Sequence, residues 1–148
     1  MESGNRVVKV RVNASGRRII GIVAYDPLYP RFSDFLNSVD RFLPVKRERA
    51  TVEVNKDAIS YLEALEEHPG EYRPAAGGFR RVQIELRAGQ GVIEGEVFLP
   101  EDADAGDLLS DGRLFLSVRG VTFQGAVEHY AFLAVPKSAI LALVVPEP

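Results

Sequence analysis

Hydrophobic and polar residues alternate along the first part of the chain. Val8, Val10 and Val12 alternate with Lys9 and Arg11, and a period of two is typical of a β-strand with one buried face. Residues 13–16 (NASG) are turn formers, and the apolar stretch at 19–25 follows them directly. The pattern therefore predicts a β-hairpin at the start of the chain.

Prolines and a capping residue divide the next part of the chain into short elements. Pro27 and Pro30 end the second strand, because proline has no N–H to donate to a sheet. Ser33 is a good N-cap residue, so we predict a single helical turn over residues 34–38. Further strands are predicted over residues 42–46, 51–55 and 58–65.

The second half of the chain repeats the first in five ordered blocks, which indicates an internal duplication. The matched blocks are 6–12 with 80–86, 19–23 with 93–97, 33–37 with 106–110, 42–45 with 115–118, and 54–59 with 135–140. The extra residues of the second copy fall around 119–130. We therefore expect a longer hairpin in that copy, over about residues 118–133.

The duplication predicts two small units, at residues 1–65 and 80–148, with a linker rich in glycine and proline at 66–79. Five short strands and one short helical turn in each copy are typical of a small, strongly bent barrel. A copy of this size has a marginal core of its own. We therefore expect the two copies to pack together, or each to lend an edge strand to a neighbour.

Composition narrows the functional classes. The 148 residues include no cysteine, which excludes a disulfide scaffold, thiol catalysis and cysteine-ligated metals. We find no apolar run near the ~20 residues of a membrane span and no signal-peptide pattern at the N-terminus. A cytoplasmic protein without membrane association is therefore expected.

The charge of the chain is uneven. The net charge is −3, with 12 basic and 11 acidic residues in 1–74 against 6 and 10 in 75–148. A surface that attracts phosphate is therefore expected only in the first half. The candidate basic residues there are Lys46, Arg47 and Arg49, with Arg17 and Arg18 in the other hairpin. Charged hairpin tips also prevent aggregation through strand edges, and we favour that structural interpretation.

An aspartate recurs near the start of the helical turn in both copies, as Asp34 and Asp107. Such a carboxylate can act as a base, but it more commonly accepts backbone N–H groups at a helix start. We therefore interpret both aspartates, with Asn37, as structural turn residues. An enzyme would need a cleft joining Asp34, Asp107 and His129. Because the chain contains no catalytic motif, we predict no catalytic residue, no cofactor and no metal site.

Two segments resemble the second Sm motif of the Sm-like proteins, the family of the bacterial RNA chaperone Hfq. They are VNKDAIS at 54–60 and VPKSAI at 135–140, the latter followed by LVVP at 143–146. Gly21, Asp34 and Asn37 resemble the first Sm motif. The resemblance implies an Sm-like barrel in each copy and RNA binding near Lys56 and Lys137.

The sequence thus predicts an all-β protein of two tandem Sm-like five-stranded barrels, related by internal duplication, each with one short helical turn. The predicted function is non-catalytic binding or assembly. Strand edges and the extended hairpin would contact another copy of the chain, as a homo-oligomer, or another protein. The alternative is an RNA-binding protein that uses Lys46, Arg47, Arg49 and Lys56.

Overall fold

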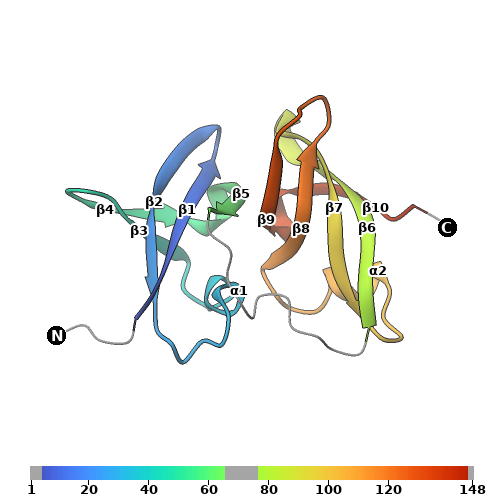
Figure 1. Cartoon of the computed structure of the whole chain (residues 1–148), viewed down its shortest axis with the longest axis horizontal. Coiled ribbons are helices and arrows are strands. Elements are labelled where there is room, and N and C mark those ends of the chain that lie inside the picture. The colour runs from blue at the N-terminus through green and yellow to red at the C-terminus, as the bar shows by residue number, and fades with distance from the viewer. Residues whose placement is uncertain (1–4, 66–76, 147–148) are drawn as a thin grey trace.

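The structure is a computed structural model that describes residues 5–65 and 77–146. The first half contains β1 (Arg6–Ala14), β2 (Arg17–Tyr25), α1 (Phe32–Leu36), β3 (Phe42–Lys46), β4 (Thr51–Asn55), the 3-10 turn η1 (Lys56–Ala58) and β5 (Ile59–Ala64). The second half contains β6 (Gly77–Leu86), η2 (Arg87–Gly89), β7 (Gly91–Pro100), α2 (Ala105–Leu109), β8 (Phe115–Phe123), β9 (His129–Pro136), η3 (Lys137–Ala139) and β10 (Ile140–Val144). Strands dominate both halves (Figure 1), which confirms the all-β class.

The ten strands form one antiparallel sheet in the order β10-β6-β7-β8-β9-β5-β1-β2-β3-β4. Within each half the last strand lies beside the first, and the other strands follow in chain order. The sheet runs through both halves without closing, and β10 and β4 are its two edges. The hydrogen-bond pattern therefore gives a single open sheet rather than two separately closed barrels.

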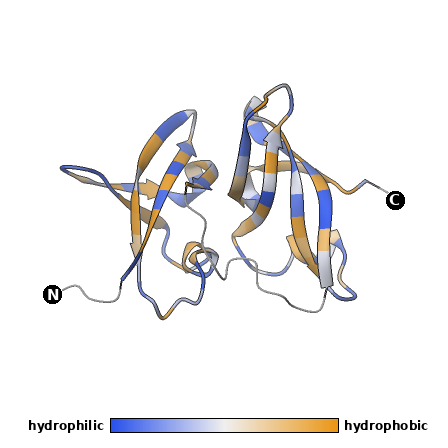
Figure 2. Cartoon of the chain, in the orientation of Figure 1, coloured by the Kyte–Doolittle hydropathy of each residue, from blue (hydrophilic) through white to orange (hydrophobic). Residues whose placement is uncertain are grey.

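Alternation of apolar and polar residues determines which face of each strand is buried. Val8, Val10 and Val12 are fully buried, whereas Lys9 between them is exposed. The same banding is visible along the strands of both halves (Figure 2). The β1–β2 turn lies at Ser15 and Gly16, both with positive φ, as the turn residues of the sequence predicted.

Gly21 and Gly95 let neighbouring strands approach closely in the two halves. A Cβ on Gly21 would lie 2.6 Å from the Lys46 carbonyl oxygen and 2.7 Å from a Val45 methyl. A Cβ on Gly95 would meet a Val118 methyl at 2.7 Å and the Arg119 carbonyl oxygen at 3.0 Å. In each half a side chain at this position would push the second strand away from the third.

The first helix begins earlier than the sequence predicted. Its N-cap is Arg31 rather than Ser33, and Ser33 is buried inside the first turn. The Asp34 carboxylate accepts the Arg31 backbone N–H at 3.1 Å, which fixes the start of the helix at that residue. The earlier start also places Phe32 and Leu36, four residues apart, on one face towards the core.

Two other boundaries differ from the expected ones. The final strand of the first half is β5, since residues 56–58 form the turn η1 before it. Strand β6 already begins at Gly77, inside the predicted linker. The rest of that linker, residues 66–76, includes His68 and lies outside the described residues.

Candidate functional site: a strand junction and two free edges

Strands β5 and β9 join the two halves of the sheet. They pair antiparallel, with Leu62 opposite Ala134 and Glu63 opposite Leu133. Strand β5 is the last strand of the first half, and β9 is the fourth strand of the second half. The two strands face one another at the centre of the molecule (Figure 1). We call this pairing and the contacts around it the junction.

Apolar side chains cross the junction in both directions. Phe115, Phe132 and Ala134 of the second half belong to the core cluster of the first half. They are 2%, 6% and 0% exposed, respectively. Tyr61 of β5 packs in turn against the core of the second half, with its ring centroid 5.1 Å from that of Phe123. The two halves therefore complete one another's cores.

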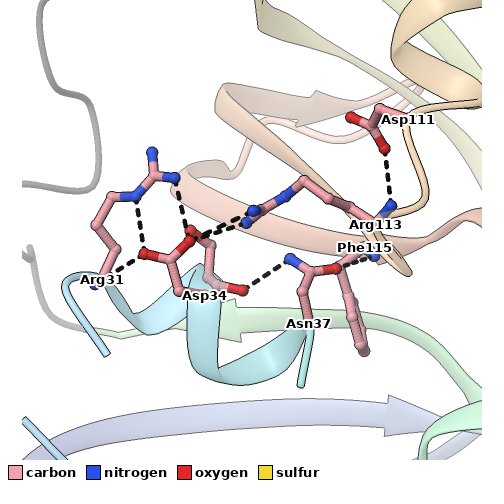
Figure 3. Close-up of polar contacts among 7 residues, drawn as sticks. Arg31, Asp34, Asn37, Asp111, Arg113 and Phe115 are labelled. Atoms are coloured by element: carbon pink, nitrogen blue, oxygen red, sulfur yellow. Dashed lines mark hydrogen bonds and ion pairs between the residues drawn. The ribbon is translucent and has the colours of Figure 1, made fainter. Parts of the chain in front are cut away.

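Polar contacts from α1 hold the beginning of β8 at the junction (Figure 3). The Asp34 carboxylate pairs with Arg31 at 3.2 Å and with Arg113 of the second half at 3.3 Å. The Asn37 side-chain oxygen accepts the Phe115 backbone N–H at 2.7 Å, while its amide nitrogen donates to the Ser33 carbonyl. The predicted turn residues Asp34 and Asn37 thus also join the two halves.

The charge at Asp34 depends on its two arginine neighbours. Partial burial alone would raise the pKa of this carboxyl group. The hydrogen bond and charge of Arg31, together with those of Arg113, outweigh the burial and hold the pKa of Asp34 below its ordinary value. Asp34 is therefore a charged structural partner rather than a proton acceptor suited to neutral pH.

Lys56 is buried and bonded to backbone carbonyl groups. It is 5% exposed, and its amino group donates to the carbonyl oxygens of Leu36 at 3.0 Å and Ser38 at 3.2 Å. Burial lowers the pKa of Lys56, and the charge of Asp40 opposes that effect. The amino group of Lys56 ties the end of α1 to the turn that follows β4.

Lys137 occupies the matching position in the second half but uses a different partner. Its amino group pairs with the Asp111 carboxylate at 2.5 Å. Burial would raise the pKa of Asp111, but the hydrogen bonds and charges of Lys137 and Arg113 together outweigh it and lower that pKa. The two lysines that the Sm resemblance singled out are thus both engaged within the chain.

The other predicted basic residues lie away from Lys56. Lys46, Arg47 and Arg49 are exposed at the tip of the β3–β4 hairpin. Lys56 follows the last residue of β4, at the base of the same hairpin, where Phe42 pairs with Asn55. At a rise of about 3.3 Å per residue, the four-residue length of the hairpin separates tip and base by roughly 13 Å. The structure does not bring these four cations into one patch.

The residues of the enzyme hypothesis lie in separate elements. Asp107 accepts the Asp104 backbone N–H at 2.9 Å and so caps α2, as Asp34 caps α1. His129 is exposed at the beginning of β9. Across residues 5–65 and 77–146, no group of three or more histidine, cysteine, aspartate or glutamate side chains is arranged to hold a metal ion.

The extended hairpin of the second half contributes to the junction through one face. Phe123 and Tyr130, near its end, stack edge to face with centroids 5.6 Å apart, and Phe123 also meets Tyr61. Val127, in the turn between β8 and β9, is 92% exposed. The hairpin therefore contacts the first half close to its end, while Val127 in the turn itself is exposed to solvent.

The two sheet edges have contrasting chemistry. Strand β10 reads ILALV, without a polar residue, and Leu141 and Val144 on it are 67% and 42% exposed. Strand β4 reads TVEVN and follows the charged tip. No motif in the sequence predicted β10 as an exposed edge. The available signal was its apolar run, at the place where the first copy has ISYLEA.

Searches with protein-family models, curated proteins and solved structures found no match to this chain. The helices of the described residues are all too short or too polar to cross a membrane.

Proposed function

We propose that this protein is a non-catalytic binding and assembly module, which contacts other protein chains through its strand edges and its extended hairpin. The observation that carries the proposal is the apolar, half-exposed edge strand β10. Exposed edges are usually protected by charged side chains or proline, because free N–H and C=O groups pair readily with another strand. The described residues of β10 carry neither form of protection.

The junction supports this proposal because it shows how such an edge is filled. At β5, the β9 strand supplies backbone partners, and Phe115 and Phe132 supply apolar cover. The same combination of strand addition and aromatic anchors is common in protein recognition by sheet edges. We propose that β10 is covered by a protein segment in the same way, and that the exposed hairpin tip adds to the contact.

We further propose that each half is one Sm-like barrel unit and that the two arose by duplication. The order of elements supports the proposal, since each half runs through two long strands, a helix, two strands, a 3-10 turn and a final strand. Matched details support it too. Lys56 N–H donates to the Arg41 carbonyl at 2.9 Å, and Lys137 N–H donates to the Leu114 carbonyl at 2.8 Å.

Light scattering of nuclease-treated and untreated protein tests the proposed function, with the absorbance ratio recorded across the peak. We compare the wild type with Leu141→Lys/Val144→Lys, which places charges on the β10 edge. Leu28→Lys is the control, since Leu28 is 86% exposed in the β2–α1 loop. The proposal predicts a protein-only assembly, either at a multiple of 16.3 kDa or as a stoichiometric complex with another protein. Only the double variant should lose this assembly.

Two outcomes would overturn the proposed function. One is a monomer without a bound component in the wild type. The other is a peak that carries nucleic acid and loses mass after nuclease treatment, which would favour the RNA-binding alternative. In that case Lys46, Arg47 and Arg49, exposed at the hairpin tip, would be the first residues to reverse in charge.

A further inference from the structure

We propose that the outward side of strands β1, β2 and β3 is a second docking surface, which binds an acidic amphipathic helix of another protein. This inference goes beyond the proposed function, because it concerns a sheet face rather than the β10 edge. The three strands lie side by side within the sheet. Their sequences, RVVKVRVNA, RRIIGIVAY and FLPVK, contain six cations and no carboxylate.

Alternation and register determine which side chains share this side of the sheet. Val8, Val10 and Val12 point into the core, so the β1 residues between them point outward. Cross-strand partners lie on the same face of a sheet. The outward pairs are Val7 with Ala24, Lys9 with Ile22, Arg11 with Ile20, Asn13 with Arg18, and Ile22 with Lys46 of β3. We call the side chains of Val7, Lys9, Arg18, Ile20, Ile22 and Lys46 the outer face.

The outer face combines exposed aliphatic groups with unpaired cations. Its aliphatic members Val7, Ile20 and Ile22 are 54%, 44% and 38% exposed. Its three cations are exposed as well, and they form no ion pair with any residue that the structure describes. Apolar groups that gather on one surface mark interaction sites, whereas singly scattered ones do not. This surface therefore calls for a partner with both apolar side chains and carboxylates.

The covered part of the same side shows how such a partner fits. Next to the outer face, Arg11 lies opposite Glu63 of β5 and pairs with it at 3.2 Å. Asn13 lies opposite Tyr61 and donates to its hydroxyl group at 3.2 Å. Phe123 of the β8–β9 hairpin then packs on the Tyr61 ring, with centroids 5.1 Å apart. A carboxylate thus meets the cation and an apolar ring supplies cover, and the outer face continues this contact without either.

The geometry favours a helix that lies along β2. Both edges of β1, β2 and β3 are paired within the sheet, so a partner meets side chains rather than free N–H and C=O groups. Ile20 and Ile22 form an aliphatic row on β2, about 7 Å apart at the rise of a strand. Ile22 has Lys9 on one side and Lys46 on the other. An amphipathic helix with an apolar stripe between acidic flanks matches this order.

The chemistry of the outer face suits a protein better than a single-stranded nucleic acid. Nucleic acids of that kind are held by phosphate contacts together with aromatic rings on which the bases stack. The outward positions of β1 and β2 contain no aromatic residue, and Tyr25 of β2 faces the core. Phe42 of β3 is four residues from Lys46, roughly 13 Å at the rise of a strand. An apolar helix stripe would bury the aliphatic row, which phosphates would leave exposed.

Titration of the full chain with three synthetic peptides tests the inference, with binding measured by fluorescence anisotropy. Each peptide has about 18 residues, long enough to form an isolated helix. The first has leucine at i, i+3, i+4 and i+7, with glutamate on both sides of this stripe. The second has lysine in place of glutamate, and the third has serine in place of leucine. The first should bind about tenfold or more tightly than the others, and its affinity should fall as salt is added.

Two double variants locate the binding. Ile20→Thr/Ile22→Thr removes the aliphatic row and keeps residues that suit a strand. Lys9→Glu/Arg18→Glu reverses two cations of the outer face. Each should weaken binding of the first peptide by about tenfold or more.

Two further variants serve as controls. Arg80→Glu/Arg81→Glu makes the same change of charge on β6, which matches β1 in the repeat, at two exposed positions. Leu141→Lys/Val144→Lys changes the β10 edge. Both should bind the first peptide as the wild type does, and circular dichroism and thermal unfolding verify the fold of all variants.

The outcomes separate this inference from the proposed function. No binding of the first peptide, equal binding of the serine peptide, or binding that survives both outer-face variants would overturn the inference. Tighter binding of a mixed-sequence single-stranded RNA, lost in the same two variants, would also overturn it and would assign the outer face to nucleic acid. None of these results changes the light-scattering test of β10. Conversely, a β10 variant that still binds the first peptide supports the outer face even if the proposed assembly at β10 fails.

Discussion

Single residues at the junction show how much a polar contact depends on its place in the fold. Asp34 combines two tasks, since it caps α1 through the Arg31 N–H and pairs with Arg113 of the other half. The capping task could be predicted from the position of Asp34 near a helix start. The pairing could not, because Arg113 is 79 residues away in the chain and no local pattern relates the two residues.

Asp34→Asn should reduce stability at neutral pH and remove part of the acid sensitivity. The folded-state pKa of Asp34 is lowered, so its contribution is present above the ordinary pKa and is lost as the pH falls through the lowered value. We expect a loss of about 1–2 kcal/mol in the free energy of unfolding at pH 7. The loss should shrink at acid pH, below about pH 4.

Urea unfolding of the wild type and Asp34→Asn at pH 7 and pH 3 measures this effect. Asp26→Asn, in an exposed loop, is the control. An equal difference between wild type and Asp34→Asn at both pH values would contradict the assigned role of the carboxylate charge.

Lys56 is a residue for which the resemblance and the structure suggest different roles. The Sm motif implies RNA contact, whereas its amino group lies buried against two backbone carbonyl groups. Lys56→Met keeps the apolar stem and leaves those carbonyl groups without their donor. We expect a loss of about 1–3 kcal/mol in the free energy of unfolding, measured in urea. Lys46→Met, at the exposed tip, should change it by less than about 0.5 kcal/mol, and equal effects would contradict the structural role.

At the scale of elements, the strands were predictable because their signal is local. Alternation and turn residues correctly predicted β3 and β4 to the residue. The predicted start of α1 was wrong. Ser33 has the side chain of a typical N-cap, but it lies buried inside the first turn of the helix. Burial of Phe32 and Leu36 on one face decided the boundary, and that depends on the core rather than on the capping residue.

The close approach of the second and third strands should make Gly21 and Gly95 sensitive to substitution. Gly21→Ala and Gly95→Ala each place a Cβ within 3.0 Å of neighbouring atoms, including backbone atoms for Gly21. We expect each to destabilise the protein by about 1–3 kcal/mol, measured by thermal or urea unfolding. Gly78→Ala is the matched strand control, since no atom lies within 4 Å of its Cβ position, and it should be nearly neutral.

At the scale of the whole molecule, the decisive features are the order of the strands and the two edges that it leaves free. The matched sequence blocks, and the expectation that the two halves share strand edges, came from the sequence. The partner strands themselves, β5 with β9, could not be predicted from local patterns, because the pairing joins residues such as Leu62 and Ala134 that lie far apart in the chain. The apolar character of β10 becomes informative only once β10 is known to be an edge.

Hydrogen exchange of the full chain, measured peptide by peptide at low and high protein concentration, tests whether β10 is an edge that binds another protein segment. Unpaired edge amides exchange readily, whereas amides bonded to a neighbouring strand are protected. Coverage of β10 by a protein segment predicts that the amides of β10 gain protection as concentration rises, while β5 and β9 stay unchanged. Exchange in β10 that does not depend on concentration, or protection confined to the 124–128 hairpin tip, would contradict it.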